Sequence, residues 1–304
     1  SLGIAANAEE ATYKVGICQL IQHEALDAAT QGFQDALTEK LGDRVEFDVQ
    51  NASGESVNCS TIINGFVSDQ VDLILANATG ALQAAVAGTS DIPILGTAVT
   101  DYATALDIDD WTGTVGGNVS GTSDCAPLDQ QAAMILELVP EAKTVGMLYC
   151  SAEPNSEYQV NVVTEALKEL NPDLEIKNYT FADSNDISSV ATSATECDVV
   201  YIPTDNTAAN NTEAINNVME PAGVPVIAGE AGICQGCGIA TLSISYYDLG
   251  YTTGEMAYEI LEEGADISTM EVQYAPNVTK QYMADRCEKL GITVPDDYEA
   301  IEAE

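Results

Sequence analysis

Short apolar runs alternate with longer amphipathic segments along most of the chain. The apolar runs have the length of strands, and the segments between them carry apolar residues at the three- and four-residue spacing of helices. Strands that are apolar throughout are typical of a parallel sheet covered on both faces, so the pattern predicts an α/β protein. We expect strands at 13–18, 45–49, 71–76, 92–96, 144–149, 174–179, 198–202 and 224–228, and helices at 24–40, 59–68, 80–87, 155–170, 186–194, 207–220, 247–263 and about 281–290.

The two halves of the chain repeat this rhythm. Residues 13–18 (YKVGIC) and 144–150 (TVGMLYC) are each an apolar strand with an internal glycine and a terminal cysteine. Each opens a series of alternating strands and helices, which indicates domain duplication rather than a solenoid repeat. The length of 304 residues also suits two domains of roughly 150 residues each.

Three segments are candidates for crossings between the lobes. Residues 115–124 (VGGNVSGTSD) are rich in glycine and serine, and the other candidates are 240–245 and 271–276 (EVQYAP). Three crossings favour rigid-body closing of two lobes. We therefore predict two doubly wound parallel-sheet lobes joined by a three-segment hinge. The expected division is 12–119 plus 246–272 for lobe 1 and 120–245 plus 273–304 for lobe 2, with 1–11 as a tether or an added end.

Acidic residues outnumber basic ones by 49 to 9, which gives a formal net charge of −40. Such a charge repels nucleic acids and anionic membrane surfaces, so neither is expected as a partner. The acidic residues are spread along the chain, on what must be solvated faces, and a high-salt habitat is one explanation. No apolar run approaches the roughly 20 residues that a membrane span needs.

Eight cysteines and a single histidine limit the chemistry that the chain can perform. Cys234 and Cys237 form a lone CxxC pair without a nearby histidine, so we expect a local disulfide there and no metal site. The other cysteines are expected as small buried apolar residues. GxSxG, HExxH and Walker sequences are absent, and one histidine leaves little room for a catalytic triad. We therefore expect neither catalysis nor a cofactor.

Polar residues follow several predicted strands where loops meet helix N-termini, which is where open α/β sheets bind ligands. In lobe 1, the amides of 77–80 and the Thr79 hydroxyl can hold a carboxylate, or Asn77 or Thr79 merely caps the helix. In lobe 2, Asp205 can bind an ammonium group, or Asp205 or Asn206 caps the next helix. Together they predict a zwitterion that bridges the lobes and closes them through its differential affinity for the closed state. An apolar or aromatic ligand side chain would fill the middle.

Further candidates lie at the remaining strand ends and crossings, and each has an alternative role as a cap, turn or core residue. These candidates are Gln19, His23, Gly80, Asp101, Ser123, Asp124, Asn155, Ser156, Thr207, Glu230, Tyr246 and Asp248. Trp111, the only tryptophan, falls in an acidic loop away from these positions, which argues against a sugar site with stacked aromatics.

Six segments carry a resemblance to a known family. They are 14–27 (KVGICQLIQHEALD), 94–102 (ILGTAVTDY), 116–124 (GGNVSGTSD), 149–156 (YCSAEPNS), 202–210 (IPTDNTAAN) and 243–254 (SISYYDLGYTTG). In this order they resemble ABC-transporter substrate-binding proteins of the type I periplasmic-binding-protein fold, above all lipoproteins that bind tryptophan and other aromatic amino acids. The resemblance runs from Tyr13 to about Tyr298. The cysteines and the acidity depart from the family pattern.

The resemblance implies an extracytoplasmic solute-binding protein, on the cell surface with a lipid anchor or in the periplasm. It implies a monomer that delivers an aromatic or hydrophobic amino acid to an ABC permease, with ligand contacts at the Asp205 motif. The alternatives are a sugar- or nucleoside-binding protein of the same fold and a sensory module without transport. A regulator of the LacI kind would need a basic DNA-binding segment, whereas the N-terminus here is acidic.

Overall fold

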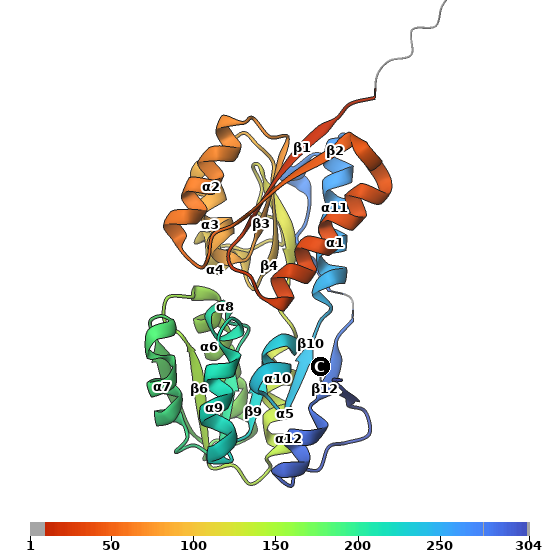
Figure 1. Ribbon diagram of the computed structural model, residues 1–304. Coiled ribbons are helices and arrows are strands. Elements are labelled where there is room, and N and C mark those ends of the chain that lie inside the picture. Colours follow the sequence, from red (N-terminus) through yellow and green to blue (C-terminus); the bar gives the residue numbers. More distant parts are fainter. Residues whose placement is uncertain (1–9, 276, 303–304) are drawn as a thin grey trace, which may run out of the picture.

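The computed structural model describes residues 10–275 and 277–302, which form two lobes, each a sheet between two layers of helices (Figure 1). The strand order is β11-β5-β4-β3-β1-β2 in the first sheet and β13-β12-β10-β9-β8-β6-β7 in the second. Neighbouring strands run parallel, except that β10 and β12 are antiparallel. The predicted α/β fold with two parallel-sheet lobes is therefore confirmed.

Lobe 1 holds the first sheet. Its strands are β1 (Tyr13–Gln19), β2 (Val45–Asn51), β3 (Leu73–Asn77), β4 (Ile94–Val99), β5 (Val119–Ser123) and β11 (Gln273–Tyr274). Its helices are α1 (Glu24–Leu41), α2 (Ser56–Ser68), α3 (Thr79–Gly88), α4 (Tyr102–Leu106) and α11 (Tyr246–Leu261), with 3-10 turns at Gly42–Arg44 and Ile267–Thr269. Side chains alternate between the faces of each strand, so Ile17 packs with α1 and α11 while Cys18 packs with α2 and α3.

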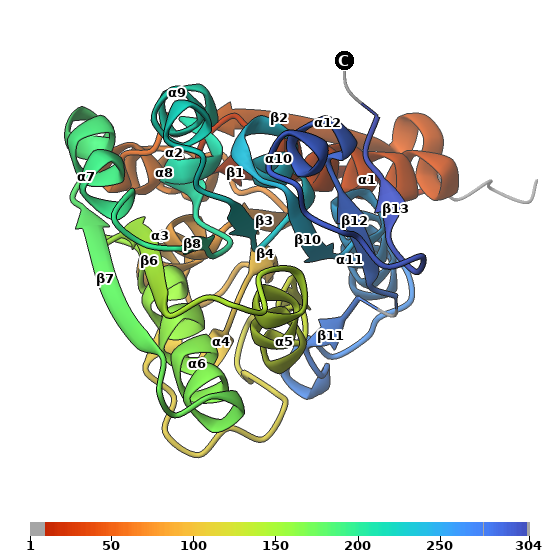
Figure 2. The ribbon, with the colours of Figure 1, turned by 90° about the horizontal axis from the view of Figure 1, so that it is seen from below.

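Lobe 2 holds the second sheet. Its strands are β6 (Thr144–Cys150), β7 (Glu175–Phe181), β8 (Val199–Ile202), β9 (Val226–Ala228), β10 (Ala240–Ser243), β12 (Thr279–Tyr282) and β13 (Glu299–Ala300). Its helices are α5 (Leu128–Leu138), α6 (Pro154–Leu170), α7 (Ile187–Ala194), α8 (Asn206–Ala209), α9 (Thr212–Ala222), α10 (Ala231–Cys237) and α12 (Ala284–Lys289), with a 3-10 turn at Ser184–Asp186. Figure 2 shows α5 and α6 on one face of the sheet and α7, α9 and α10 on the other.

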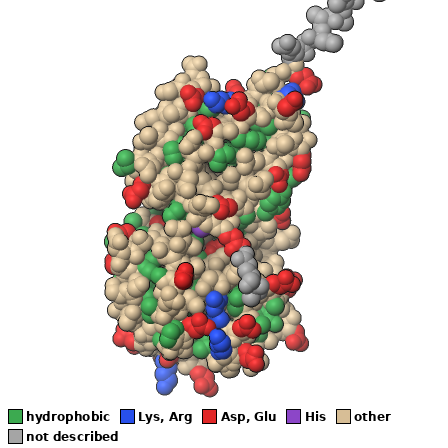
Figure 3. Space-filling model, in the orientation of Figure 1, with side chains coloured by type: hydrophobic (Ala, Val, Ile, Leu, Met, Phe, Trp, Pro, Cys, Tyr) green, Lys and Arg blue, Asp and Glu red, His purple; other side chains and the backbone are tan. Residues whose placement is uncertain are grey.

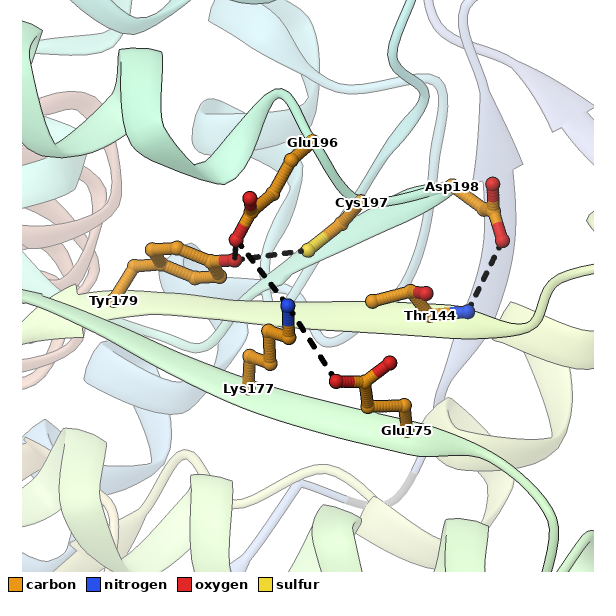
Figure 4. A network of polar contacts seen from close by, with 7 residues as sticks. All are labelled: Thr144, Glu175, Lys177, Tyr179, Glu196, Cys197 and Asp198. Atoms are coloured by element: carbon orange, nitrogen blue, oxygen red, sulfur yellow. Dashed lines mark hydrogen bonds and ion pairs between the residues drawn. The ribbon is translucent and has the colours of Figure 1, made fainter.

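The duplication expected from the sequence is visible in matching hydrogen bonds. In lobe 1, Asp72 precedes β3 and its carboxylate accepts from the backbone N–H of Lys14 at 2.8 Å. In lobe 2, Asp198 precedes β8 and accepts from the N–H of Lys143 at 2.8 Å. It also accepts from the N–H of Thr144 at 3.0 Å (Figure 4). Each aspartate thus ties the third strand of its lobe to the first strand, at the amino-terminal ends of the strands, far from the other lobe.

The helix pair α1 and α11 packs with almost no space between the backbones. A Cβ atom on Gly250 would lie 1.9 Å from the carbonyl oxygen of Ala29, and one on Gly32 would lie 2.1 Å from that of Tyr247. Only glycine fits at such contacts. These glycines therefore set the distance between the two helices.

The hinge crossings differ in position from the expected boundaries. β5 belongs to the first sheet, so the first crossing lies after Ser123 rather than at 119/120, and β11 pairs with β5, so the third lies after Tyr274 rather than at 272/273. The second crossing runs from Ser243 to Tyr246. β5 looked like a linker because its sequence is VSGTS, but its hydroxyls find partners inside the lobe: Ser120 donates to the carbonyl of Met270 at 2.9 Å.

Several elements differ from the sequence-based expectation. The expected helix 207–220 is two helices, α8 and α9, separated at Asn210 and Asn211. Residues 279–282 form β12, so the last helix begins only at Ala284. The helices α4, α5 and α10 were not predicted; α4 and α10 are too short to show a clear helical period.

All eight thiols are free, so the expected disulfide between Cys234 and Cys237 is wrong. Both residues lie on α10, and the Cys237 thiol donates to the carbonyl oxygen of Ile233 at 3.4 Å instead. Of the six other cysteines, five are buried, as predicted for small apolar residues, and Cys125 is partly buried. None of the helices in the described part of the chain combines the length and apolar character needed to cross a membrane.

Candidate functional site

The carboxyl ends of the central strands of both sheets face the cleft between the lobes, and two cavities lie in it. The larger cleft cavity, of about 500 Å³, is lined by Leu20 and Gly80 from lobe 1 and by Glu153 and Asn206 from lobe 2, among others. The smaller cleft cavity has about 430 Å³. It is lined by His23 and Glu24 from lobe 1 and by Glu230, Met283 and Arg286 from lobe 2, among others. Both volumes lie in the range of small-molecule sites.

The N-terminus of α3 is the clearest anion-binding feature of lobe 1. Thr79 is 2% exposed, and its hydroxyl has no hydrogen-bond partner among the described residues. The preceding residue, Ala78, cannot cap the helix, so the first backbone N–H groups of α3 stay available beside that hydroxyl. Gly80 follows in the wall of the larger cleft cavity. Hydroxyl and amide donors at a helix N-terminus are suited to a carboxylate.

Two alanines at this edge of the sheet have strained backbones. Ala78 has φ of 94° and Ala98 has φ of 53°, and both side chains are buried. Ala78 connects β3 to α3, and Ala98 lies in a bulge where β4 pairs irregularly with β5. Non-glycine residues in the left-handed region cost free energy and concentrate at functional sites.

Gln19 and Asn77, which were expected to contact ligand, bind other parts of lobe 1. Gln19 donates to Asp27 at 2.7 Å and accepts from the Thr30 hydroxyl at 2.7 Å. The Asn77 amide donates to Thr30 and to the carbonyl of Leu26, both at 2.9 Å, although its Oδ1 has no partner among the described residues. Both side chains therefore tie the sheet to α1.

Buried carboxyl groups gather where the hinge meets lobe 2. The Tyr246 hydroxyl donates to Asp124 at 2.6 Å, and the Thr100 hydroxyl lies 3.4 Å from the other oxygen. Burial raises the pKa of Asp124. Burial also raises the pKa of Glu230 to about 7, and the charges of Glu24 and Asp124 add to this shift. None of the ion pairs in the described ranges involves either carboxyl group.

Glu230 also caps α10. Its carboxylate accepts from the backbone N–H groups of Gly232 at 3.0 Å and Ile233 at 2.5 Å. These two donors lower the pKa and so oppose the effect of burial. Each oxygen of the carboxylate receives one such bond and retains a free lone pair.

Asp205 has its oxygens engaged within lobe 2. One oxygen accepts from the N–H of Ala208 at 2.8 Å, and the other accepts from the N–H of Cys150 at 2.8 Å and from the Ser156 hydroxyl at 2.7 Å. Burial and the nearby Glu153 raise its pKa. Of the two roles considered for Asp205, the structure displays the helix cap, with Ser156 as its partner.

Of four other predicted site residues, two have local roles, one lines a cavity and one lies outside both cavities. Asp101 caps α4 by accepting from the N–H of Thr104 at 2.9 Å, and the Ser123 hydroxyl donates to the carbonyl of Thr100 at 2.9 Å. Asn155 lines the larger cleft cavity. Asp248 is exposed on α11 and lines neither cleft cavity.

His23, Asn206 and Thr207 do come together at the cleft: His23 lines the smaller cavity, and Asn206 and Thr207 line the larger one. The His23 ring lies 2.9 Å from Asn206 across the cleft. Asn206 and Thr207 are both held by Glu153, which the sequence did not single out. Gln159 was also missed; it lies 3.5 Å from Thr100 across the cleft. The only signal for Glu153 was its place before Pro154, a residue favoured in the first turn of a helix.

Comparisons with known proteins agree on one family. The family model described as ABC transporter substrate binding protein matches residues 14–303. A tyrosine-binding protein of Clostridioides difficile (strain R20291) is 37% identical over 252 residues, which cover 82% of this chain and 72% of that protein.

Two solved structures bear on the arrangement of the lobes. The ABC domain of Streptococcus pneumoniae in complex with L-Trp has a TM-score of 0.90 at 29% identity, covering 96% of this chain and 100% of that one. The ligand-free, open structure of a substrate-binding protein with adhesive properties from Clostridium difficile has a TM-score of 0.73 at 34% identity and the same coverage.

The open structure is more similar in sequence yet less similar in shape. A different angle between the lobes lowers the TM-score of the whole chain, even when each lobe keeps its own shape. The described chain, with its contacts across the cleft, thus resembles the ligand-bound arrangement more than the open one. The resemblance inferred from the sequence is confirmed: the chain belongs to the ABC transporter substrate-binding protein family and has the type I periplasmic-binding-protein fold.

Proposed function

We propose that the chain is the solute-binding protein of an ABC importer and that it captures an aromatic or hydrophobic amino acid between its lobes. The observation that carries this proposal is the buried Thr79 hydroxyl at the N-terminus of α3, which has no hydrogen-bond partner in the described part of the chain. An unpartnered buried hydroxyl costs free energy unless a ligand supplies its hydrogen bond. Beside helix amides, the ligand group with the right charge is a carboxylate.

The ammonium end of the ligand is assigned to the carboxyl groups at the hinge. Glu230 and Asp124 are buried, and neither forms an ion pair with a basic side chain of residues 10–275 or 277–302. An ammonium group would supply the missing positive charge. This assignment differs from the one expected from the sequence, which favoured Asp205. Asp205 already has three donors within lobe 2, whereas each oxygen of Glu230 has one.

A zwitterion held in this way contacts both lobes only when they are closed. Thr79 belongs to lobe 1, and Glu230 belongs to lobe 2. The ligand therefore binds the closed form more tightly than the open form, and this differential affinity drives closure. The cavities in the cleft provide room for the ligand's apolar side chain, which branches from the carbon that carries both charged groups.

The choice of an aromatic amino acid rests on two relatives, one called a tyrosine-binding protein and one crystallised with L-Trp. Substrate-binding proteins of ABC transporters work outside the cytoplasm. We further propose that this chain acts as a monomer, held by a lipid anchor or free in the periplasm, that it passes its ligand to a permease, and that it catalyses no reaction.

A ligand screen tests the proposal. The melting temperature of the purified protein is measured with each of the twenty common amino acids, with common sugars and with nucleosides. We expect L-tyrosine, L-tryptophan or another apolar amino acid to raise it, since a ligand that binds only the folded state stabilises that state. A response to sugars or nucleosides alone would replace the proposal with that alternative.

A further inference from the structure

A direct hydrogen bond joins the lobes in the middle of the cleft. His23 directly precedes α1 of lobe 1, and Asn206 is the first residue of α8 in lobe 2. The imidazole Nε2 lies 2.9 Å from Asn206 Oδ1. His23 lines the smaller cleft cavity and Asn206 lines the larger one, so both cavities border the contact.

Glu153 fixes the partner of this bond. One oxygen of its carboxylate accepts from the backbone N–H and from the side-chain Nδ2 of Asn206, both at 2.9 Å. The other oxygen accepts from the N–H of Thr207 at 3.0 Å and from its hydroxyl at 2.9 Å. Four donors from the start of α8 thus converge on one carboxylate, all of them within lobe 2.

The direction of the hydrogen bond across the cleft follows from this clamp. A carboxylate accepts hydrogen bonds and donates none, so the group of Asn206 that faces Glu153 must be its NH₂. The carbonyl oxygen of the carboxamide is then left to face His23. The ring nitrogen must therefore donate, which places a proton on Nε2. Burial lowers the pKa of His23, so this is the neutral tautomer protonated on Nε2.

We propose that His23 and Asn206 form a latch that holds the lobes closed over a bound ligand, and that Glu153 is the positioning residue that keeps the Asn206 carboxamide turned toward His23. The latch is present only in the closed form, so it stabilises that form relative to the open one. It therefore slows ligand release and leaves ligand entry into the open form unchanged. The identity of the ligand rests on the proposed function, whereas the latch itself rests on the contact between the lobes.

Paired substitutions at His23 separate the hydrogen bond from the bulk of the ring. His23→Gln places an amide N–H near the position of Nε2 and keeps the donor. His23→Asn places the amide N–H near the position of Nδ1, and this shorter side chain cannot reach Asn206. Stopped-flow fluorescence with L-tyrosine and L-tryptophan measures association and dissociation. We expect H23N to raise the dissociation rate roughly two- to tenfold, the range of one hydrogen bond, and H23Q to stay close to the unsubstituted protein.

Glu153→Gln tests the positioning residue, because the glutamine replaces one acceptor oxygen with an NH₂ donor, which cannot accept the hydrogen bonds from α8. We expect E153Q to raise the dissociation rate as H23N does, and the double variant H23N/E153Q to be no faster than H23N alone, since both remove the same bond. Glu157→Gln, on the exposed side of α6, is the matched control and should change nothing. Equal rates in H23N and H23Q, or a change confined to association, would overturn the latch.

The latch can still be tested if no amino acid binds. That result rejects the proposed function, and the latch is then judged by small-angle scattering of the ligand-free proteins. The latch predicts a larger radius of gyration for H23N than for H23Q and the unsubstituted chain. Three identical scattering profiles in that case would reject the latch as well.

Discussion

The Tyr246 hydroxyl donates a 2.6 Å hydrogen bond to the Asp124 carboxylate, and this bond joins two of the three hinge crossings. Asp124 follows β5 on the first crossing, and Tyr246 begins α11 at the end of the second. Both side chains are buried. Crossings that are tied to each other bend together, which suits the closing of two rigid lobes.

Removing this hydroxyl should destabilise the protein. Tyr246→Phe leaves the buried Asp124 carboxylate with one weak partner, so we expect the free energy of unfolding to fall by about 1–3 kcal/mol. Urea denaturation measures the change. Tyr247→Phe is the control on the same helix, because its hydroxyl binds Asp35 in an exposed position and should matter little. A loss no greater than that of the control would contradict a structural role for the Tyr246–Asp124 bond.

Thr79→Val keeps the shape of the side chain and removes the hydroxyl. If that hydroxyl binds the ligand carboxylate, the affinity for L-tryptophan or L-tyrosine should fall about tenfold or more, as for a hydrogen bond to a charged group. Isothermal titration calorimetry gives the affinity. Thr61→Val, on the exposed side of α2, should bind like the unsubstituted protein. An unchanged affinity in Thr79→Val would remove this residue from the site.

Asp205→Ala separates the two roles that the sequence left open. A ligand role predicts more than tenfold weaker binding with folding intact. The structure instead predicts a loss of stability of about 2–4 kcal/mol, because Cys150, Ser156 and Ala208 lose their buried acceptor. Thermal denaturation of the ligand-free protein distinguishes the two. The exposed cap Asp183→Ala serves as the control. A fully stable Asp205→Ala protein would restore the ligand role.

Much of the fold could be predicted because buried parallel strands carry continuous apolar runs. β1 and β6 were placed within about one residue of their ends for this reason. β5 was missed because it is polar. Its Thr122 hydroxyl bonds to Thr97 and Thr253, which lie 25 and 131 residues away in the sequence. A strand whose burial depends on such distant partners leaves no local pattern.

The candidate site was predictable in location but not in the assignment of its charges. Asp205 and Glu230 both follow a strand and precede a helix, so the sequence could not distinguish them. Only the structure reveals that Asp205 has three donors whereas Glu230 has two. Glu153 acts on Asn206, which is 53 residues away, so its role also depends on the folded chain.

The stability of the ligand-free protein should depend on the ionisation of Glu230. Its pKa is raised from 4.5 to about 7 in the folded state. A raised carboxyl pKa means that the folded state binds more protons than the unfolded state between these values. This contribution is complete below pH 4.5 and is lost as the pH rises through 7. We expect the melting temperature to fall between pH 5 and 8, with a smaller fall in Glu230→Gln. Equal slopes for both proteins would contradict the shift.

The ligand affinity should change in the opposite direction. An ammonium group binds the ionised carboxylate, so amino-acid binding should strengthen as the pH rises through 7. Calorimetry at pH 5.5 and pH 8 measures this difference, and Glu230→Gln should lose most of it. An affinity that is independent of pH in this interval would exclude Glu230 as the ammonium ligand.

The acidic surface predicts a requirement for salt. The net charge is −40, and Figure 3 shows acidic side chains over both lobes with few basic ones between them. The Debye length falls from about 10 Å at 0.1 M salt to about 3 Å at 1 M, which weakens repulsion between these charges. We expect the melting temperature to rise over this interval of KCl concentration. A constant or falling melting temperature would indicate that the repulsion is already balanced in dilute buffer.

The glycine contacts between α1 and α11 link the cleft mechanically to the hinge. Gly32 and Gly250 bring the backbones of α1 and α11 so close together that the two helices must move as one rigid body. His23 lies at the cleft end of α1 and Tyr246 at the hinge end of α11. A bulkier residue at Gly250 would push α1 and α11 apart. It would therefore disturb both the His23–Asn206 bond across the cleft and the hinge at Tyr246.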